Sequence, residues 1–335
     1  MNNYTEWMLV QISSFRNVTD SVREFRLIYP EQHNFKTGSH VDVEVTIAGK
    51  PDRRSYSIVN IDDDGGVYIA VKRLDKGRGG SKYMWTLSAG CCLRATAPIS
   101  EFELSRGAPC YLLLAGGIGV TPILSMAREL VVRGADVRMV YAVRSRAELA
   151  YLDELRTILD VRLEVFVTEE GQTIDIAREI AALPAGGETY LCGPISLMDA
   201  TRTEWARQGR RAAQLRFETF GSSGHALSRA FTVKIPRLMM EVEVPSDRSM
   251  LDALREAGVA VIAECLRGEC GLCTVEVISA DAPIDHRDVF LGIKEQARDK
   301  RMCACVSRAT GETISIETAW RGDPDFSQIE VLNAR

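Results

Sequence analysis

The sequence predicts a multidomain chain in which an antiparallel β-barrel, a parallel-sheet α/β domain and a small α+β domain follow one another. Short segments of alternating polarity, separated by turn residues, fill the first third of the chain. Continuous apolar strands alternate with helical stretches in the middle third. A hairpin, a capped helix and a cysteine-rich loop make up the rest. We expect domains at residues 1–106, 107–222 and 230–320, a linker at 223–229 and a C-terminal extension at 321–335.

The composition excludes some classes of partner. The 335 residues include 41 Lys and Arg against 46 Asp and Glu, so no basic excess is present to neutralise nucleic-acid phosphates. The start "MNNYTEWMLV" lacks the charged beginning and apolar run of a signal peptide. The longest apolar run, "CYLLLAGGIGV", is too short to cross a bilayer. We therefore expect a cytoplasmic protein without a nucleic-acid or membrane partner.

In the first domain, turn-forming segments separate several strands. The turns are "KTGSH", "GKPD" and "DDDGG", and the strands are "VREFRLI", "HVDVEVTI", "RSYSIVN" and "VYIAVKR". Short strands at regular spacing predict an antiparallel barrel.

The second and third domains differ in pattern. Buried strands "YLLLA", "VRMVYAV", "LEVFV" and "TYLC" alternate with helices such as "TPILSMARELVVRG", which predicts a parallel sheet. The polar stretch "GSSGHALSR" has linker composition. After it come a hairpin ("FTVKI", "MEVEV"), a helix "SMLDALREAG" that ends at Gly258, and a late strand "TISIET".

A glycine turn joins a buried strand to a helix in "LLLAGGIGVTPILSMAREL". Gly116, Gly117 and Gly119 would let backbone amides approach a pyrophosphate at the positive end of the helix. Thr121 is the predicted N-cap and Pro122 the first helical residue. The spacing is not G-x-G-x-x-G, so a structural turn stays an alternative.

A second turn of the same kind occurs in "YLCGPISLMDA", at Cys192, Gly193 and Pro194. Ligands of open α/β sheets bind at the carboxyl ends of strands. The two turns together therefore favour a bound dinucleotide more strongly than either one alone.

Two segments of the barrel suit a phosphate-bearing aromatic ligand such as a flavin. The strand "RRSYSI" places a guanidinium, a ring and a hydroxyl close together at Arg54, Tyr56 and Ser57. The loop "KGRGGSKYM" offers a phosphate cradle that opens a helix, at Gly79, Gly80 and Ser81. The alternative is an exposed strand and a flexible loop.

The loop "CLRGECGLC" carries the most specific signal. Cys265, Cys270 and Cys273 have the C-x4-C-x2-C spacing of plant-type [2Fe–2S] ferredoxins. A zinc ribbon would need two C-x2-C pairs, and only one is present in this pattern. The later segment "MCACVSRAT" offers Cys303 and Cys305 as the fourth ligand, and counting along the chain slightly favours Cys303. The intervening loop "SADAPIDHRDVFLGIKEQARDKRM" is expected to absorb a change of two residues, because loop closure depends weakly on length.

These motifs, in this order, resemble the phthalate dioxygenase reductase family, which includes the vanillate demethylase reductases. The segments are "RSYS", "GRGGS", "AGGIGVTP", "CGP", "FETFG" and "C-x4-C-x2-C…CVSRA", and the resemblance covers nearly the whole chain. It implies a flavin-binding barrel, an NAD-binding α/β domain and a β-grasp ferredoxin domain. These would pass electrons from NADH through FMN and a [2Fe–2S] cluster to a terminal Rieske oxygenase that acts on aromatic rings.

The resemblance also implies roles for particular residues. Ser57 and Phe220 would lie at the reacting rings, although Phe220 could instead be an aromatic plug between domains. The cluster ligands would be Cys265, Cys270, Cys273 and Cys305, because the family ligand begins "CVSRA". The flavin would be held by Arg54, Tyr56, Ser57, Lys72, Gly79, Gly80 and Ser81. NADH would be held by Gly116, Gly117, Gly119, Thr121, Pro122, Cys192, Gly193 and Pro194.

Several alternatives remain open. Arg144 and Arg146 follow the strand "VRMVYAV" and could grip the 2′-phosphate of NADPH, whereas the resemblance favours NADH. No additional adenylate motif occurs between Lys82 and Pro109, which favours FMN over FAD. The same electron path could serve a diiron hydroxylase or a cytochrome P450. A non-enzymatic alternative is a binding module in which the cysteine loop holds zinc and mediates assembly.

Overall fold

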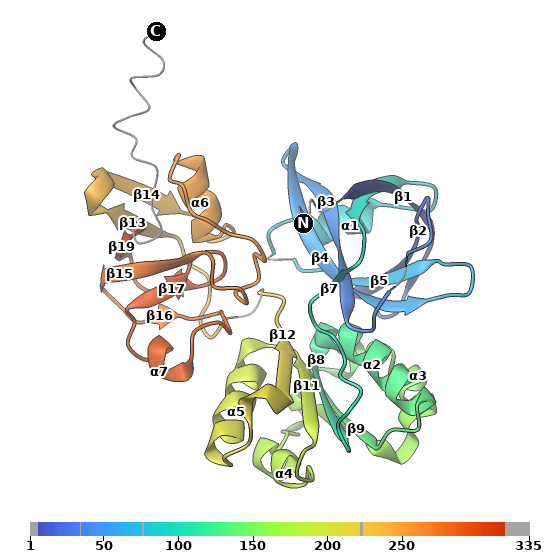
Figure 1. Ribbon diagram of the computed structural model, residues 1–335. Helices are drawn as coiled ribbons and strands as arrows, with labels where there is room; N and C mark the ends of the chain where they lie inside the picture. The colour runs from blue at the N-terminus through green and yellow to red at the C-terminus, as the bar shows by residue number, and fades with distance from the viewer. Residues whose placement is uncertain (1–5, 34, 76, 222–223, 319–335) are drawn as a thin grey trace. The chain divides into compact units, whose positions relative to one another are not determined.

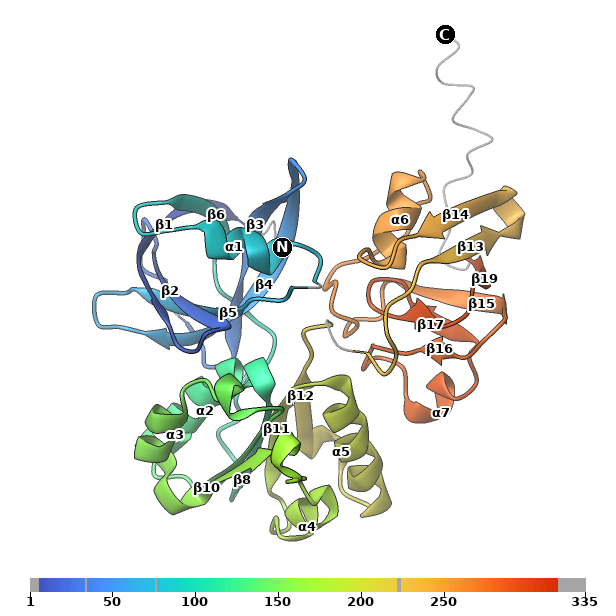
Figure 2. The same ribbon diagram turned by 180° about the vertical axis from the view of Figure 1, so that it is seen from behind.

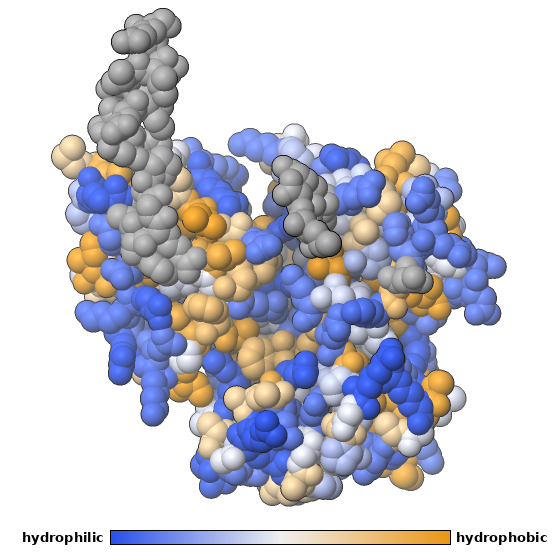
Figure 3. All heavy atoms as spheres, viewed as in Figure 1, coloured by the Kyte–Doolittle hydropathy of each residue, from blue (hydrophilic) through white to orange (hydrophobic). Residues whose placement is uncertain are grey.

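The computed structural model describes residues 6–33, 35–75, 77–221 and 224–318. The chain forms two compact units, the first ending at Phe220 and the second beginning at Gly221 (Figure 1). The predicted extension 321–335 lies outside the described residues. No helix in the described ranges has the length and apolarity of a membrane span. The face seen in Figure 3 is largely hydrophilic, with hydrophobic residues scattered in small groups.

The first part of unit 1 is an antiparallel barrel. Its strands follow the order β4-β5-β2-β1-β6-β3, and pairing of β3 with β4 closes the sheet, while β7 pairs with β3. Val41, Val43 and Val45 are fully buried at every second position of β3, as an alternating strand requires. The elements are β1 (Trp7–Asn17), β2 (Val22–Ile28), β3 (Ser39–Ile47), β4 (Lys50–Ile61), β5 (Val67–Lys72), α1 (Gly80–Thr86), β6 (Cys92–Thr96) and β7 (Ile99–Ser100).

The second part of unit 1 is a parallel sheet of order β10-β9-β8-β11-β12 with helices on both sides (Figures 1 and 2). The uninterrupted burial of β8 explains its continuous apolar sequence. The elements are β8 (Tyr111–Gly116), α2 (Val120–Val132), β9 (Val137–Val143), α3 (Leu152–Leu159), β10 (Leu163–Val167), α4 (Ile176–Ala181), β11 (Glu188–Cys192), α5 (Ile195–Arg207) and β12 (Leu215–Glu218).

The barrel and the parallel sheet share one apolar core. Val59 and Phe102 from the barrel belong to the same buried cluster as Ile123 and Met126 of α2. Polar contacts add to this core: the Tyr151 hydroxyl donates to the buried carboxylate of Glu24 at 2.9 Å. The two parts of unit 1 are therefore fixed to each other by side chains from both.

Unit 2 is an α+β domain with the β-grasp arrangement. Its five-stranded sheet has the order β14-β13-β19-β15-β17, in which only β13 and β19 are parallel, and β16 pairs with β18. Ser249 caps α6 by accepting a hydrogen bond from the Asp252 amide at 3.1 Å. The elements are β13 (Phe231–Ile235), β14 (Met240–Val244), α6 (Met250–Glu256), β15 (Thr274–Ala280), β16 (Ile284–Asp285), α7 (Ile293–Gln296), β17 (Arg301–Cys303), β18 (Arg308–Ala309) and β19 (Thr313–Glu317).

Two local predictions were wrong. Thr121 does not cap α2, because a 3-10 turn at Gly117–Gly119 runs directly into the helix and the Thr121 hydroxyl donates to the Ile118 carbonyl at 3.0 Å. The stretch after Ala280, predicted as a loop with length to spare, contains β16, α7 and β17. Its Asp288 carboxylate is fully buried and accepts hydrogen bonds from Ser307 and Leu291, both at 2.9 Å. The segment after Ala280 is therefore an ordered part of unit 2 with regular secondary structure.

Candidate functional site

The two predicted glycine turns lie side by side at the carboxyl edge of the parallel sheet. β8 pairs with β11, with Ala115 opposite Cys192. A methyl group on Gly119 would lie 2.2 Å from the Cys192 carbonyl oxygen, and one on Gly116 would lie 2.4 Å from Cδ of Pro194. The two turns therefore pack backbone against backbone, and a side chain at Gly116 or Gly119 would prevent this close approach. The strand order also reverses between β8 and β11, and this switch point is where open α/β sheets bind dinucleotides.

Ser57 of the barrel reaches the same edge. Its hydroxyl, which is buried, donates a hydrogen bond to Glu218 Oε2 at 3.3 Å. Glu218 ends β12 and lies opposite Cys192 of β11 in the parallel register. Phe220 follows two residues later and packs, partly buried, against the core of unit 1. The structure therefore joins Ser57 to the strand end beside Cys192 through Glu218, and Phe220 packs against the apolar core that contains Cys192.

Glu218 lies at this candidate site and was missed by sequence reasoning. The segment "FETFG" contains Glu218, but it was interpreted only for its second phenylalanine, Phe220. The carboxylate is buried at 2% exposure, and burying a carboxylate demands hydrogen-bond partners. Its contact with Ser57 supplies one of them and joins the barrel to the nucleotide turns.

The barrel strand and its glycine loop also meet. Arg54 Nη2 donates to the Arg78 carbonyl at 3.2 Å, and a methyl group on Gly80 would lie 2.6 Å from Arg54 Nε. Gly79 has a φ of +87°, a left-handed conformation that favours glycine. A guanidinium thus lies against a bare backbone turn, an arrangement that fits a terminal phosphate.

Arg54 also pairs through Nη1 with Asp52 at 2.8 Å, and other predicted flavin residues have protein partners as well. The Lys72 ammonium pairs with Glu148 at 3.1 Å, and the Ser81 hydroxyl accepts a hydrogen bond from the Leu74 amide at 3.1 Å. Tyr56 lies partly buried against the barrel core, and this burial raises the pKa of its hydroxyl. Lys72 and Ser81 therefore connect neighbouring segments of unit 1.

The cysteine loop forms a nest around one sulfur. Cys265 Sγ accepts hydrogen bonds from the backbone amides of Arg267, Glu269 and Cys270 at 3.4, 3.5 and 3.4 Å. Left-handed Gly268 (φ +79°) turns the backbone so that these amides converge. Amides directed at sulfur stabilise negative charge, which fits a thiolate ligand of an iron–sulfur cluster.

Both candidate fourth ligands adjoin Cys273. Hydrogen bonds lower the pKa of Cys273 to about 4, with the larger effect from Cys303 and the next largest from Cys305. Cys303 lies in β17 opposite Thr274, whose hydroxyl is 3.6 Å from its sulfur. Cys305 lies in the turn after β17, and its raised pKa, due mainly to Cys273 and burial, includes an effect of Cys265.

Within the described ranges, no three Cys, His, Asp or Glu side chains converge on a single ion position. A [2Fe–2S] cluster does not require such a group, because its four thiolates are shared between two irons. The donor set here is five cysteines, three of them buried, which suits this cluster better than a single zinc ion.

Acidic residues pair with the two exposed arginines that follow β9. Arg144 Nε lies 3.0 Å from Glu169, and Arg146 Nη2 donates to Glu170 at 2.7 Å. The Glu169 amide also donates to the Arg144 carbonyl at 3.0 Å, which holds the loop after β10 against the loop after β9. Both guanidinium groups are thus engaged by carboxylates.

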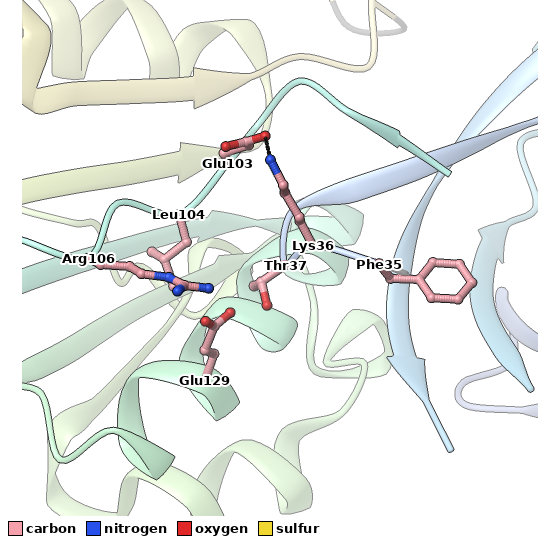
Figure 4. Close-up of a pocket in the computed structure, with 7 residues that line it drawn as sticks. All are labelled: Phe35, Lys36, Thr37, Glu103, Leu104, Arg106 and Glu129. Atoms are coloured by element: carbon pink, nitrogen blue, oxygen red, sulfur yellow. Dashed lines mark hydrogen bonds and ion pairs between the residues drawn. The ribbon is translucent and has the colours of Figure 1, made fainter. Parts of the chain in front are cut away.

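A polar pocket of ≈ 660 Å³ occurs elsewhere in unit 1 (Figure 4). In the close-up, Lys36 extends to Glu103, with which it pairs at 2.6 Å, and Phe35 points away from the other side chains. None of the predicted cofactor residues lines this pocket, whose lining is Phe35, Lys36, Thr37, Glu103, Leu104, Arg106 and Glu129.

Three protein-family models match the chain in succession. They are an oxidoreductase FAD-binding domain over residues 9–104, an oxidoreductase NAD-binding domain over 113–203 and a 2Fe-2S iron-sulfur cluster binding domain over 235–310. Their order agrees with the barrel, the parallel sheet and the cysteine-bearing domain.

Relatives match over nearly the full length. The heme-dependent oxidative N-demethylase beta subunit of Ectopseudomonas mendocina is 34% identical over 92% of this chain and 98% of its own. Phthalate dioxygenase reductase of Burkholderia cepacia is 31% identical over 93% and 97%.

Solved structures also match this chain over most of its length. A phthalate dioxygenase reductase structure has a TM-score of 0.70 and 30% identity over 93% of this chain and 98% of that one. A type IV self-sufficient cytochrome P450 monooxygenase has a TM-score of 0.64 and 31% identity over 92% and 41%. The chain belongs to the phthalate dioxygenase reductase family and is an NADH-dependent flavin and iron–sulfur oxidoreductase.

Proposed function

We propose that the chain is the cytoplasmic reductase component of an aromatic-ring Rieske oxygenase and delivers electrons from NADH through FMN and a [2Fe–2S] cluster. The observation that carries this proposal is the meeting of Ser57, Glu218 and Cys192 at the sheet edge, on the same chain as a plant-type cysteine loop. The order of the matching domains supports it, as does the resemblance of the motifs to a family that serves such oxygenases.

A bound flavin would supply the conversion from the two-electron chemistry of NADH to the one-electron chemistry of the cluster. The residues of this chain would bind and orient the flavin and NADH. Arg54 and the Gly79–Gly80 turn would hold the flavin phosphate, and the glycine turns of β8 and β11 would hold the pyrophosphate of NADH. Ser57 and Phe220 would contact the reacting rings, with the Ser57 hydroxyl oriented by Glu218.

The acceptor is tested by turnover with purified partners. We expect the protein to support NADH-dependent product formation by an aromatic-ring Rieske oxygenase at least tenfold faster than by a diiron hydroxylase or a cytochrome P450. The second candidate is a heme acceptor, which two of the similar proteins favour: a heme-dependent demethylase subunit and a P450 monooxygenase. Faster turnover with the P450 would replace the first proposal by the second.

Cys305 is the proposed fourth cluster ligand, beside Cys265, Cys270 and Cys273. The position of Cys303 in the β15–β17 ladder, next to Thr274, supports a structural role for it. Cys305 lies in the turn after β17, outside that ladder, and Cys265 is among the groups that raise the pKa of Cys305.

We expect Cys305→Ser to abolish or strongly perturb the cluster, because serine replaces a thiolate ligand. Cys303→Ser should leave the visible and EPR spectra nearly unchanged. Reduction of the flavin by NADH should persist in both variants, since the hydride reaches the flavin before the cluster is involved. Loss of the cluster in the Cys303 variant alone would reverse the assignment.

The flavin is proposed to be FMN, held through Arg54. Because a charge-assisted hydrogen bond contributes about 1.5–3 kcal/mol, Arg54→Ala should weaken FMN binding by roughly 10- to 100-fold while the cluster is retained. Arg94→Ala is the control, since Arg94 is an exposed barrel arginine paired with Glu44 at 3.1 Å. Chromatography of flavin released by denaturation identifies the cofactor, and stoichiometric FAD from the wild-type protein would refute the FMN assignment.

Discrimination against NADPH is proposed to depend on Glu169 and Glu170, which form ion pairs with Arg144 and Arg146. Replacing both by glutamine should raise kcat/KM for NADPH by roughly three- to tenfold, because exposed ion pairs contribute up to about 1 kcal/mol each. The value for NADH should change little. Glu164→Gln is the control, because Glu164 pairs with Arg178 at 3.0 Å near the other end of β10. A wild-type preference for NADPH would contradict the proposal outright.

A further inference from the structure

A buried carboxylate lies beside the segment that carries the proposed fourth cluster ligand. Asp288 is fully buried, and it accepts hydrogen bonds from the Ser307 hydroxyl and from the Leu291 amide, both at 2.9 Å. Ser307 follows Cys305 by two residues. The Asp288 side chain is therefore bonded to the chain directly after that ligand.

The backbone of the same turn packs against the cysteine loop. A methyl group on Gly268 would lie 2.9 Å from Cα and 3.0 Å from Cβ of Asp288. The Gly268 carbonyl accepts hydrogen bonds from the amides of Val289 at 3.0 Å and Phe290 at 3.2 Å. The residues on both sides of Gly268 donate their amides to Cys265 Sγ. Asp288 thus contacts both segments that carry the predicted ligands.

The side chains around Asp288 leave a net negative charge there. His286 Nδ1 lies 3.6 Å from Asp288 Oδ1, and its Nε2 lies 3.0 Å from Asp299 Oδ1. One imidazole therefore serves two carboxylates, and their sum stays negative even when the imidazole is protonated. Arg287 is already paired with Asp285 at 2.8 Å. Reduction potentials of iron–sulfur clusters depend on charge and on solvent exposure, so a buried anion in this place has a consequence.

We propose that the Asp288 carboxylate lowers the reduction potential of the [2Fe–2S] cluster. Reduction adds one negative charge to the cluster, and a fixed anion nearby makes that addition less favourable. The same anion favours the later release of the electron to the acceptor. The consequence for the acceptor rests on the proposed function, whereas the effect on the potential requires the cluster alone.

The expected size follows from Coulomb's law. Unit charges about 8 Å apart at an effective dielectric constant of about 20 change an equilibrium constant roughly thirtyfold, and stronger screening by water reduces this to about fivefold. Removing the charge should therefore favour the reduced cluster by roughly five- to thirtyfold. For a one-electron couple this corresponds to a rise of about 40–90 mV in the midpoint potential.

The test is a redox titration of the full-length holoenzyme without any oxygenase, followed by the visible and EPR signals of the cluster. Asp288→Asn removes the charge and keeps the shape of the side chain, so it should raise the potential by this amount. Iron content and EPR g values should stay as in the wild-type protein. Asp281→Asn is the control, because Asp281 is exposed and follows the seven-residue strand β15, which begins directly after Cys273. It lies roughly 25 Å along that strand from the ligand and should change the equilibrium less than twofold.

A second variant separates the charge from the hydrogen bonds. Ser307→Ala removes one hydrogen bond to the Asp288 carboxylate but keeps its charge, so the equilibrium should change less than twofold. An unchanged potential in Asp288→Asn would overturn the proposal. An equal rise in the Ser307 variant would also overturn it, because the contacts would then explain the effect.

Asp288→Ser removes the same charge and is the second choice if the Asn variant does not assemble a cluster. Loss of the cluster in both Asp288 variants would show that the carboxylate is needed for assembly, and would overturn the electrostatic role. Failure of the wild-type protein to support a Rieske oxygenase would instead refute the proposed function, and would leave the measured potentials as they are.

Discussion

The organisation of unit 1 depends on the buried hydrogen bond between Ser57 and Glu218 and on the apolar core beneath it. The bond joins a strand of the barrel to the last strand of the parallel sheet. Because Cys192 lies beside Glu218 in register, the same contact fixes the barrel relative to both glycine turns. A ring bound on the barrel and a ring bound at the turns would then meet at one edge, which hydride transfer between two cofactors requires.

Much of this arrangement follows from local sequence. The valines at every second position of β3 and the unbroken apolar run of β8 are patterns that the chain shows directly. The glycine turns were predicted from their positions after strands. Sequence could not show that Gly119 touches the Cys192 carbonyl, because that contact depends on how β8 and β11 pair. The failure at Thr121 has a similar cause: the preceding 3-10 turn, rather than the residue type, decided where α2 begins.

Tertiary contacts explain the remaining differences. Lys72 and Ser81, which the resemblance assigns to the flavin, also contact Glu148 and the Leu74 amide, and sequence spacing cannot reveal these contacts. Glu218 was missed because the segment "FETFG" was interpreted through Phe220 alone, and the contact of Glu218 with Ser57 depends on the tertiary fold. The segment before β17 was predicted to tolerate a change in length because loop closure depends weakly on length. Its buried Asp288 and Arg287 form hydrogen bonds that make it a structural part of unit 2, and these contacts cannot be read from loop length.

The core shared by the barrel and the parallel sheet also bears on how such a protein can be recombined. Val59 and Phe102 pack among residues of α2, so separating the barrel from the sheet would expose apolar surface on both. Unit 2 keeps a core of its own, drawn only from residues after Phe220. A gene fusion or domain swap that cuts the chain after Phe220 would leave each core complete, whereas a cut between barrel and sheet would not. The chain therefore consists of two exchangeable modules, although it contains three cofactor-binding domains.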